Sequence, residues 1–482
     1  MASLTLNRRR GIQTVVCILL FAFILRLCVG MLYENYMDVS WYRSWAVNFQ
    51  NGFFDAYARL NTGKYALDYP PLYLYCLYIV GQLYGHLPIS DYWMFDMLAM
   101  KFFPILFDVL AAGLFYLVCR KQSEALGVLA AALWVLNPSA IFNSSHWGQT
   151  DGLMVFLLLL SFYQVERGKD LLGSILFAVA CLTKMQCLYF APVLFVYLLR
   201  PAETMPDGSD PPAKEPLFSY LRRCRWIDTL SCVGAALLTG IAGFVPFIAG
   251  SWKLQGAESL LLPFKVYFGG LGKYPYATLN AFNLYGSASL NWVKDDRAIL
   301  FGTGRDSSGF ATGGITLHHF GTLMLLLSLV LVIYIMLRGK RENRLWAGCF
   351  LFMQCVFMLT TRMHERYQFP VLLFSLMLFL RQMDFRWLMQ YLALSLMTFF
   401  NQFLLLVRNN TINDPKAPWD TIYTPVMTVM SFVNLAIFLW GVMLTVSTAF
   451  PPARREDGPV SEPVPDADAA PDYPKAERRD EA

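Results

Sequence analysis

Long apolar segments recur along most of the chain and are separated by shorter polar connections. A helix needs about 20 mostly apolar residues to cross the hydrocarbon core of a bilayer, so these segments predict membrane crossings. Twelve segments are predicted to cross, and they cover residues 12–32, 98–118, 124–142, 151–166, 171–183, 187–199, 228–249, 313–337, 345–361, 369–381, 388–407 and 423–448. The pattern therefore predicts an all-α, polytopic integral membrane protein.

One further apolar stretch, residues 70–87, has a different character. It begins with Pro70-Pro71, is rich in tyrosine and stops at Gly85-His86-Leu87-Pro88. These features favour an interfacial or re-entrant helix that lies against the bundle. A crossing remains the alternative, because hydropathy alone does not separate the two.

Positive charge gathers in alternate loops, which sets an orientation. Cytoplasmic loops of membrane proteins are enriched in Lys and Arg, and the basic clusters fall on one side if the stretch 70–87 does not cross. The clusters are Arg8-Arg9-Arg10, Arg120-Lys121, Arg167 with Lys169, Arg200 to Arg225, Arg338 to Arg344, Arg381 with Arg386, and Arg454-Arg455. We therefore predict that both termini are cytoplasmic. The loops predicted to be external are 33–97, 143–150, the turn near 184, 250–312, 362–368 and 408–422.

The composition supports this class of protein and excludes others. Of the 482 residues 56% are hydrophobic and only 15% are charged, whereas soluble proteins carry about 25% charged residues. The formal charge is +5, from 39 basic and 34 acidic residues, and the basic residues lie beside apolar segments rather than in a stripe. Nucleic acid is therefore not an expected partner, whereas the lipid bilayer is. Nine of the ten cysteines lie in apolar segments with no CxxC pair, which predicts small buried side chains rather than redox chemistry.

The predicted organisation is a single membrane domain with short polar ends. Residues 1–11 form a cytoplasmic N-terminus, and the apolar segment that follows is too long for the core of a signal peptide. Residues 12–448 form the transmembrane domain, with a cytoplasmic loop at 201–227 and an external loop at 250–312. Residues 449–482 are rich in Pro, Asp, Ala and Glu and predict a disordered cytoplasmic tail.

Two acidic residues stand out in the first predicted external loop. Asp38 lies in the aromatic-rich stretch 36–45, just beyond the first crossing, and Asp68 with Tyr69 directly precedes two prolines. Each aspartate has a structural alternative: Asp38 as the cap of an interfacial helix and Asp68 as the start of a turn.

The next two predicted external turns are more polar than a connector requires. The first contains His146-Trp147-Gly148-Gln149-Thr150-Asp151, in which Trp147 and Asp151 share one face if a helix starts there. Asp151 as a helix N-terminal acid is the alternative. The second contains Lys184 and Gln186. The alternative there is a lysine that only extends its charged end to the membrane interface.

The densest polar motif is Arg362-Met363-His364-Glu365-Arg366-Tyr367. It places two arginines on the predicted external side, against the usual charge bias, and such cations commonly have an anion to bind. A structural Arg–Glu pair is the alternative. Together the external loops offer carboxylates and cations that suit proton abstraction with stabilisation of an anionic leaving group.

No motif for a soluble cofactor is present in the sequence. It contains neither GxxxxGK[ST] nor GxGxxG after a strand, so no nucleotide cradle can be named. No spacing resembles a dedicated metal site, and neither a metal nor another cofactor is predicted. A divalent metal stays open only if His146, His364, Asp38, Asp68 and Asp151 converge.

Several short motifs occur in an order that resembles one enzyme superfamily. They are the aspartate after the first crossing, Asp-Tyr-Pro-Pro-Leu-Tyr, Trp-Gly-Gln-Thr-Asp, Thr-Lys-Met-Gln, Tyr-Pro-Tyr-Ala-Thr-Leu-Asn-Ala-Phe-Asn-Leu-Tyr (274–285) and Met-His-Glu-Arg-Tyr. The chain resembles the bacterial polytopic GT-C glycosyltransferases, in particular those related to the mannosyltransferases of GPI-anchor synthesis. The resemblance covers about residues 12–448.

The resemblance implies a hexosyltransferase of the bacterial cell membrane that acts in a cell-envelope glycan pathway. It implies a polyprenyl-phosphate sugar donor, an inverting transfer on the extracytoplasmic face and, by kinship alone, mannose as the sugar. The acceptor would be a glycan, a lipid or a protein. Asp38 matches the general base and Asp151 a second active-site carboxylate, while Asp68 is expected to bind substrate or support the base.

The remaining motif residues are expected to bind substrate. Lys184, Arg362, His364 and Arg366 are candidates to neutralise the lipid phosphate that leaves. The full set expected to bind substrate is Asp68, Tyr69, His146, Trp147, Gln149, Lys184, Gln186, Arg362, His364, Glu365, Arg366 and Tyr367.

The competing hypothesis is a transporter or flippase for a lipid-linked or anionic solute. It rests on Asp108, near the middle of the segment 98–118, with Arg26 as a possible partner, because charges inside the membrane often mark transport paths. A structural ion pair would give the same pattern. A non-catalytic assembly subunit is a third class, but it does not require acids and cations gathered on one face.

Overall fold

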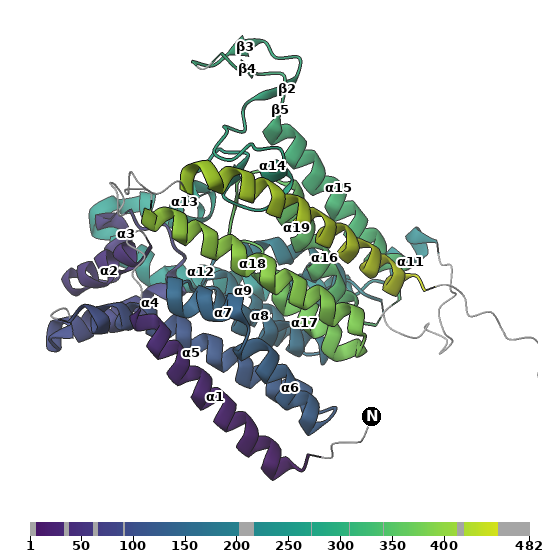
Figure 1. The fold of residues 1–482 in the computed structure, drawn as a ribbon, viewed down its shortest axis with the longest axis horizontal. Coiled ribbons are helices and arrows are strands. Elements are labelled where there is room, and N and C mark those ends of the chain that lie inside the picture. The colour runs from purple at the N-terminus through teal and green to yellow at the C-terminus, as the bar shows by residue number, and fades with distance from the viewer. Residues whose placement is uncertain are drawn as a thin grey trace, which may run out of the picture.

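Helices build most of the described part of the chain in the computed structural model (Figure 1). The structure describes residues 6–32, 38–60, 66–89, 92–201, 216–270, 272–307, 309–340, 342–411 and 419–451. The helices are α1 Arg8–Met31, α2 Asp38–Asn48, α3 Ala56–Arg59, α4 Pro71–His86, α5 Trp93–Cys119, α6 Glu124–Val135, α7 Pro138–Ile141, α8 Asp151–Glu166, α9 Asp170–Cys181, α10 Ala191–Leu198, α11 Leu217–Arg223, α12 Trp226–Gln255, α13 Leu262–Gly269, α14 Leu284–Ser287, α15 Leu317–Arg338, α16 Arg344–Leu359, α17 Pro370–Gln382, α18 Phe385–Thr411 and α19 Trp419–Ala449. Short 3₁₀ or π turns are η1 Phe49–Asn51, η3 Phe142–Trp147, η4 Met185–Phe190 and η5 Gly256–Leu261.

The all-α polytopic prediction is confirmed. Within the described ranges six helices are long and apolar enough to cross a membrane, or seven if α6 and the helix after it form one span bent by 49°. The six are α1, α5, α12 continued through α13, α15, α18 and α19. Each of the twelve predicted segments coincides with a helix, but several are short, so the number of crossings stays a prediction. The stretch 70–87 forms α4, and whether it crosses also stays a prediction.

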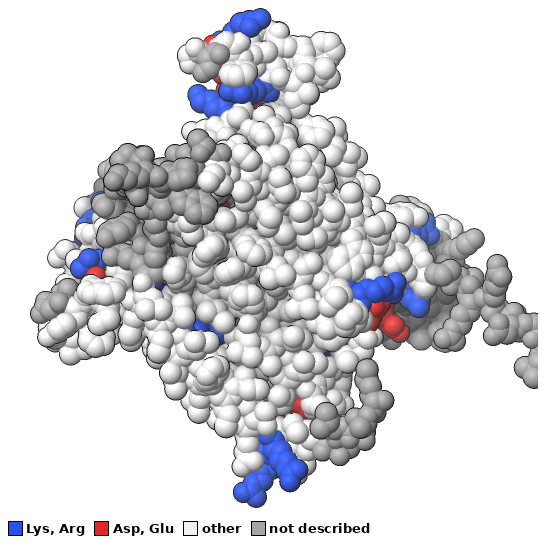
Figure 2. Space-filling model, viewed as in Figure 1, with Lys and Arg blue, Asp and Glu red and all other residues white. Residues whose placement is uncertain are grey.

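The distribution of charge on the surface fits a protein that lies in a bilayer. Figure 2 shows a broad, nearly uncharged surface between the arginines at the N-terminal end of α1 and the basic residues on the strands at the top. Outer helices expose much of their apolar surface to lipid. In α15 only 28% of the apolar segment is buried, whereas 56% of the apolar segment of α5 is buried. In contrast α17 is buried on all sides from Pro370 to Leu380, as expected of a helix that is apolar all round.

The predicted external loop 250–312 contains more structure than a connector. α12 extends to Gln255, and η5 and α13 follow it. Beyond them, β1 (Thr278–Leu279) pairs in parallel with β6 (Met363–His364). Two small antiparallel pairs stand out from the bundle at the top of Figure 1: β2 (Ala298–Leu300) with β5 (Ile315–Thr316), and β3 (Gly304–Arg305) with β4 (Ala311–Thr312). Residues 202–215 of the predicted cytoplasmic loop 201–227, and residues 452–482 of the tail predicted to be disordered, lie outside the described residues.

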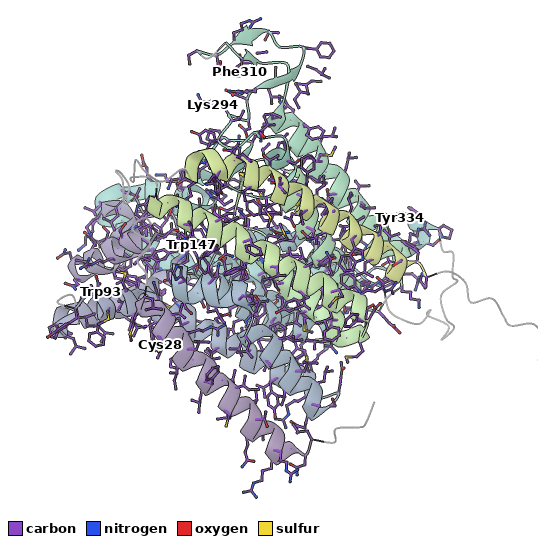
Figure 3. All side chains as sticks on the ribbon, in the orientation of Figure 1. Cys28, Trp93, Trp147, Lys294, Phe310 and Tyr334 are labelled. Carbon is purple, nitrogen blue, oxygen red and sulfur yellow. The ribbon has the colours of Figure 1, made fainter. Side chains whose placement is uncertain are left out.

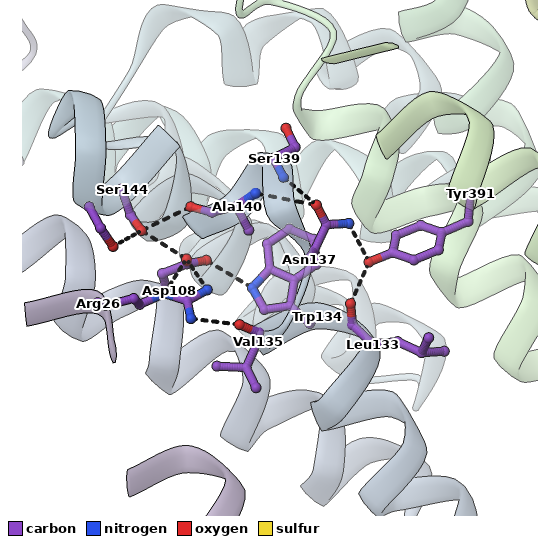
Figure 4. A network of polar contacts seen from close by, with 11 residues as sticks. Arg26, Asp108, Leu133, Trp134, Val135, Asn137, Ser139, Ala140, Ser144 and Tyr391 are labelled. Carbon is purple, nitrogen blue, oxygen red and sulfur yellow. Dashed lines mark hydrogen bonds and ion pairs between the residues drawn. The ribbon is translucent and has the colours of Figure 1, made fainter. Parts of the chain in front are cut away.

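A buried ion pair joins three helices near the middle of the bundle. Arg26 on α1 donates to Oδ2 of Asp108 on α5 at 2.9 and 3.2 Å, and both side chains are fully buried. The Asp108 carboxylate also accepts from Nε1 of Trp134 at 2.9 Å and from the Ser144 hydroxyl at 3.0 Å, while Arg26 donates to the Val135 carbonyl at 2.6 Å (Figure 4). Every charge here has partners, which is the arrangement of a structural ion pair rather than of an open transport path.

Candidate functional site

A cavity of about 290 Å³ opens where the predicted external segments meet. It is bounded by α2, the start of α4, the turns η3 and η4, the loop after β6, the end of α18 and the loop between α13 and β2. The lining residues are Asp38, Trp41, Tyr42, Asp68, Tyr69, Pro70, Trp147, Lys184, Met185, Gln186, Gly270, Lys273, Tyr274, Asn280, Trp292, His364, Glu365, Arg366, Tyr367, Leu405, Arg408 and Asn409. Ten of the fourteen predicted site residues are among them.

Asp38 lies at the first residue of α2 and is held from the side by the turn η3. Oδ2 of its carboxylate accepts from Nε1 of Trp147 at 2.7 Å and from Nε2 of Gln149 at 2.8 Å. Gly148 lies between these donors with φ +81, a left-handed conformation that glycine adopts without strain. The turn therefore aims the side-chain donors of Trp147 and Gln149 at one carboxylate oxygen.

Trp147 is fixed by its own surroundings. Trp147, which is labelled in Figure 3, packs with Phe142, Leu405 and Leu406 in a small apolar cluster. On another side, the guanidinium of Arg366 lies 5.5 Å from the centre of its ring. The segment Phe142–Trp147 is a π turn, a rare geometry that recurs at functional sites.

Arg366 and Glu365 form an ion pair in the wall of the cavity. Nη1 of Arg366 lies 2.7 Å from Oε1 of Glu365, and the Glu365 side chain is 2% exposed. Burial on its own would raise the pKa of Glu365, but the charge of Arg366 and the neighbouring His364 outweigh it and hold the pKa below its ordinary value. Burial would likewise lower the pKa of Arg366, but Glu365 and Asp38 raise it well above its usual range. Arg366 therefore carries a permanent positive charge beside Asp38.

Lys184 reaches the cavity, whereas Asp151 lies behind it. Nζ of Lys184 donates to Oδ1 of Asp151, and Nδ2 of Asn143 donates to Oδ2 at 2.9 Å. Burial lowers the pKa of Lys184, and the charge of Asp151 opposes that shift. Both carboxylate oxygens of Asp151 are occupied, so its geometry is that of a group that positions Lys184.

A second ion pair lies in the wall of the cavity near the start of α4. Nζ of Lys273 donates to Oδ2 of Asp68 at 2.6 Å and lies 5.0 Å from the ring centre of Trp41. The next residue, Tyr69, shares a hydrogen bond of 2.8 Å with the hydroxyl of Tyr42. Burial raises the pKa of Tyr69, so its hydroxyl stays protonated.

Three predicted site residues besides Asp151 do not line the cavity. Gln149 acts through Asp38, as described above. Nε of Arg362 lies 2.7 Å from Oδ2 of Asp295, because Arg362 has φ +66 and its side chain leaves the loop on the other side. The ring of His146 stacks on Phe142 at 4.5 Å.

The loop between α13 and β2 contributes site residues that the sequence did not single out. Lys273, Asn280 and Trp292 line the cavity, and so does Arg408 at the end of α18. Asn280 and Trp292 both have left-handed backbones, with φ +59 and +57, and Nε1 of Trp292 donates to Oδ1 of Asn280 at 3.3 Å. Asn280 falls in the motif 274–285, which was a signal for its importance, but no pattern in the sequence marked Trp292 or Lys273.

The described residues contain no group of three His, Cys, Asp or Glu side chains that could hold a metal ion. The cluster that most resembles a metal site contains His364 and Glu365, which lie 3.7 Å apart, but its third charged side chain is Arg366. An arginine repels a cation, so the donors of this part of the cavity suit an anion.

Comparisons with known proteins give a consistent result. A family model described as the ALG6, ALG8 glycosyltransferase family matches residues 22–439. A probable dolichyl pyrophosphate Glc1Man9GlcNAc2 alpha-1,3-glucosyltransferase of Drosophila melanogaster is 26% identical over 217 residues, which cover 42% of this chain and 39% of that protein. GPI mannosyltransferase 1 of Kluyveromyces lactis is 24% identical over 207 residues, which cover 43% of this chain and 44% of that protein. The chain thus spans about two fifths of the length of these two relatives.

A plant protein shows similarity over a shorter stretch. A dolichyl pyrophosphate Glc1Man9GlcNAc2 alpha-1,3-glucosyltransferase of Arabidopsis thaliana is 30% identical over 148 residues, or 29% of each chain. These relatives are eukaryotic, so they do not support the bacterial detail of the resemblance, which stays a prediction.

Proposed function

The chain belongs to the ALG6, ALG8 glycosyltransferase family, and from that premise we propose that it transfers a hexose from a polyprenyl-phosphate donor to an acceptor hydroxyl. The observation that supports the proposal is the position of the Asp38 carboxylate together with several basic side chains in one cavity. Asp38 faces the same space as Lys184, His364 and Arg366. A base beside a set of cations is what a displacement with an anionic leaving group needs.

The proposed reaction is a single displacement at the anomeric carbon. Asp38 accepts the proton of the acceptor hydroxyl while that oxygen attacks the anomeric carbon from the face opposite the phosphate. A new glycosidic C–O bond forms as the bond between the anomeric carbon and the phosphate oxygen breaks. The electron pair of that bond leaves with the lipid phosphate, and the configuration at the anomeric carbon inverts.

The cations of the cavity serve the leaving group. A polyprenyl phosphate leaves as a stable anion and needs neutralisation of charge more than a proton. Arg366 supplies a permanent charge, and Lys184 supplies a second one that Asp151 sustains. His364 lies beside them and contacts Tyr274 and Tyr367 edge-on or tilted, at 5.3 and 5.0 Å between ring centres.

The names of the relatives narrow the class of substrate. Two of those described are glucosyltransferases and one is a mannosyltransferase, so a hexose is proposed with glucose and mannose both open. The relatives named for dolichyl pyrophosphate oligosaccharides support a lipid-linked glycan as acceptor. The charge pattern of the loops supports an extracytoplasmic active site with both termini cytoplasmic.

The experiment is transfer by the purified full chain in detergent, from a panel of radiolabelled polyprenyl-phosphate hexoses, with mass analysis of the products. We expect one hexose to be transferred, and Asp38→Asn to lower kcat by roughly 10²- to 10⁴-fold, the range for a lost general base. The matched control is Asp228→Asn at the start of α12, whose side chain is 61% exposed and remote from the cavity. Full transfer by Asp38→Asn would refute the assigned base, and no transfer from any donor would refute the proposed function.

A further inference from the structure

Lys273 joins two cavity residues that come from different parts of the chain. Its ammonium group lies 2.6 Å from Oδ2 of Asp68 and 5.0 Å from the ring centre of Trp41, and the ring of Tyr274 lies 5.7 Å away on another side. The side chains of Lys273 and Asp68 are 36% and 33% exposed, so the pair lies at an accessible wall. The three contacts fix the lysine between Asp68 and Trp41.

Two polar atoms of this group have no partner among the residues that the structure describes. Oδ1 of Asp68 and Nε1 of Trp41 are both shielded from solvent, and neither makes a hydrogen bond with any described residue. Buried polar atoms in proteins are nearly always paired. These two belong to residues that line the cavity and contact one lysine, so a ligand in the cavity is the partner that the geometry suggests. One atom is an acceptor and the other a donor.

A hydroxyl group is the partner that satisfies both atoms. It can donate to the carboxylate oxygen and accept from the indole N–H, and two neighbouring hydroxyls of a sugar ring can divide these roles. A phosphate suits this wall less well, because the Asp68 carboxylate repels it and already neutralises Lys273. The wall is therefore complementary to a neutral polyol, whereas the wall with Arg366 and Lys184 is complementary to an anion.

The position of Trp41 places such a polyol near the reacting atoms. Trp41 follows Asp38 by three residues on α2, so the two side chains lie on one face of the helix, one turn apart. We propose that Trp41, Asp68 and Lys273 form the subsite that binds the ring hydroxyls of the transferred hexose and so select the sugar. This inference rests on the proposed function and names the part of that site that recognises the sugar.

The test measures whether the effect of one substitution depends on which hydroxyl the donor sugar lacks. Trp41→Phe removes the indole N–H and keeps an aromatic ring beneath Lys273. Transfer is measured with a short-chain polyprenyl-phosphate hexose and with its 2-, 3-, 4- and 6-deoxy analogues. We expect kcat/KM of Trp41→Phe to fall about 10-fold with the full hexose, the effect of about one hydrogen bond, and not to fall with the one analogue that lacks the bound hydroxyl.

The matched control is Trp93→Phe, the same substitution on a tryptophan that is 58% exposed at the start of α5. Figure 3 shows Trp93 at the edge of the molecule, well apart from Trp147 in the cavity wall. We expect this variant to treat every donor as the unchanged protein does. The subsite would be overturned if Trp41→Phe caused the same loss with the full hexose and with all four analogues, or if Trp93→Phe showed the same dependence on the donor as Trp41→Phe.

A second variant keeps the inference testable if Trp41→Phe folds poorly. Asp68→Asn retains one acceptor oxygen but leaves Lys273 without its counter-charge. We expect it to lower kcat/KM with the full hexose at least 10-fold and to lower it less with one of the four deoxy analogues, and an equal loss with all donors would contradict the subsite. If the unchanged protein transfers no sugar, the proposed function itself fails; if it transfers sugar without these effects, only the subsite fails.

Discussion

The indole nitrogen of Trp147 lies 2.7 Å from Oδ2 of Asp38, although 109 positions of the chain separate the two residues. The same oxygen accepts from Gln149 at 2.8 Å. Trp147 is held in turn by an apolar cluster with α18 and by the charge of Arg366. The carboxylate proposed as base therefore has its direction set by a turn that contacts both the core and the cation wall.

This relationship predicts that Trp147→Phe impairs catalysis without removing any reacting group. Phenylalanine keeps the apolar contacts with α18 but loses the hydrogen bond, so Asp38 is less well oriented. We expect kcat to fall about 10-fold while KM for the donor changes less than 3-fold, in steady-state assays of the purified protein. Trp226→Phe is the control, because it removes a hydrogen bond of 2.8 Å that an exposed indole N–H donates to the Leu221 carbonyl. Equal losses in kcat for the two variants would argue against a positioning role of Trp147.

The pair formed by Lys184 and Asp151 predicts a change in the pH profile. Burial lowers the pKa of Lys184, and Asp151 opposes that shift, so Asp151→Asn should lower the pKa further. The lysine then loses its proton at a lower pH, and kcat/KM of the variant should decline at a lower pH on the alkaline side than that of the unchanged protein.

The partner substitution provides the control for this prediction. Lys184→Met removes the charge at every pH, so it should lower kcat/KM by roughly 10²-fold with no new pH dependence. In the double variant Asp151→Asn with Lys184→Met, the loss should match that of Lys184→Met alone, because both act through one cation. Losses that add in the double variant would show that Asp151 acts independently, as a second active-site carboxylate would.

The ion pair of Glu365 and Arg366 predicts a stability that depends on pH. The pKa of Glu365 is lowered in the folded state, so the pair stabilises the fold above the ordinary pKa of about 4.5. That contribution is lost as pH falls through the lowered folded pKa, because Glu365 then becomes protonated. Glu365→Gln should lower the midpoint of heat inactivation in detergent at pH 7 by several degrees, since it leaves Arg366 without its counter-charge.

The difference between Glu365→Gln and the unchanged protein should shrink as the pH is taken below about 4.5. Glu258→Gln is the matched control, because Glu258 is 74% exposed and pairs with Lys265 at the surface. Exposed pairs contribute little, so its midpoint should not move measurably. A difference for Glu365→Gln that stays constant from pH 7 to pH 4 would contradict the proposed charge effect.

The helices could be predicted from the sequence because their signal is local. A continuous apolar run such as 369–381 has few alternatives to a buried helix, and α17 occupies Pro370–Gln382. The motif residues also pointed to the right region, since the turns that contain Trp147, Lys184 and His364 all meet at one cavity.

The direction of each side chain could not be predicted in the same way. Arg362 and Arg366 belong to one motif, but the left-handed backbone at Arg362 sends the first to Asp295 while the second lines the cavity. Lys273 contacts Asp68 across 205 positions of sequence, and no local pattern encodes such a contact. Its role depends on how the loop after α13 returns to the bundle, which is set by long-range pairing such as that of β1 with β6.

The last prediction separates enzyme from transporter and concerns the buried pair of Arg26 and Asp108. Asp108→Asn leaves the buried guanidinium of Arg26 without a counter-charge, which should cost about 3–5 kcal/mol of stability. If the pair is structural, the folded fraction of this variant should transfer sugar with kcat within 2-fold of the unchanged protein. The double variant Arg26→Met with Asp108→Leu should regain most of the lost stability, because apolar residues can replace a buried ion pair. A double variant that is stable but transfers no sugar would instead assign the pair a functional role in the membrane. The same would follow if liposomes with the unchanged protein took up solute and liposomes with the stable double variant did not.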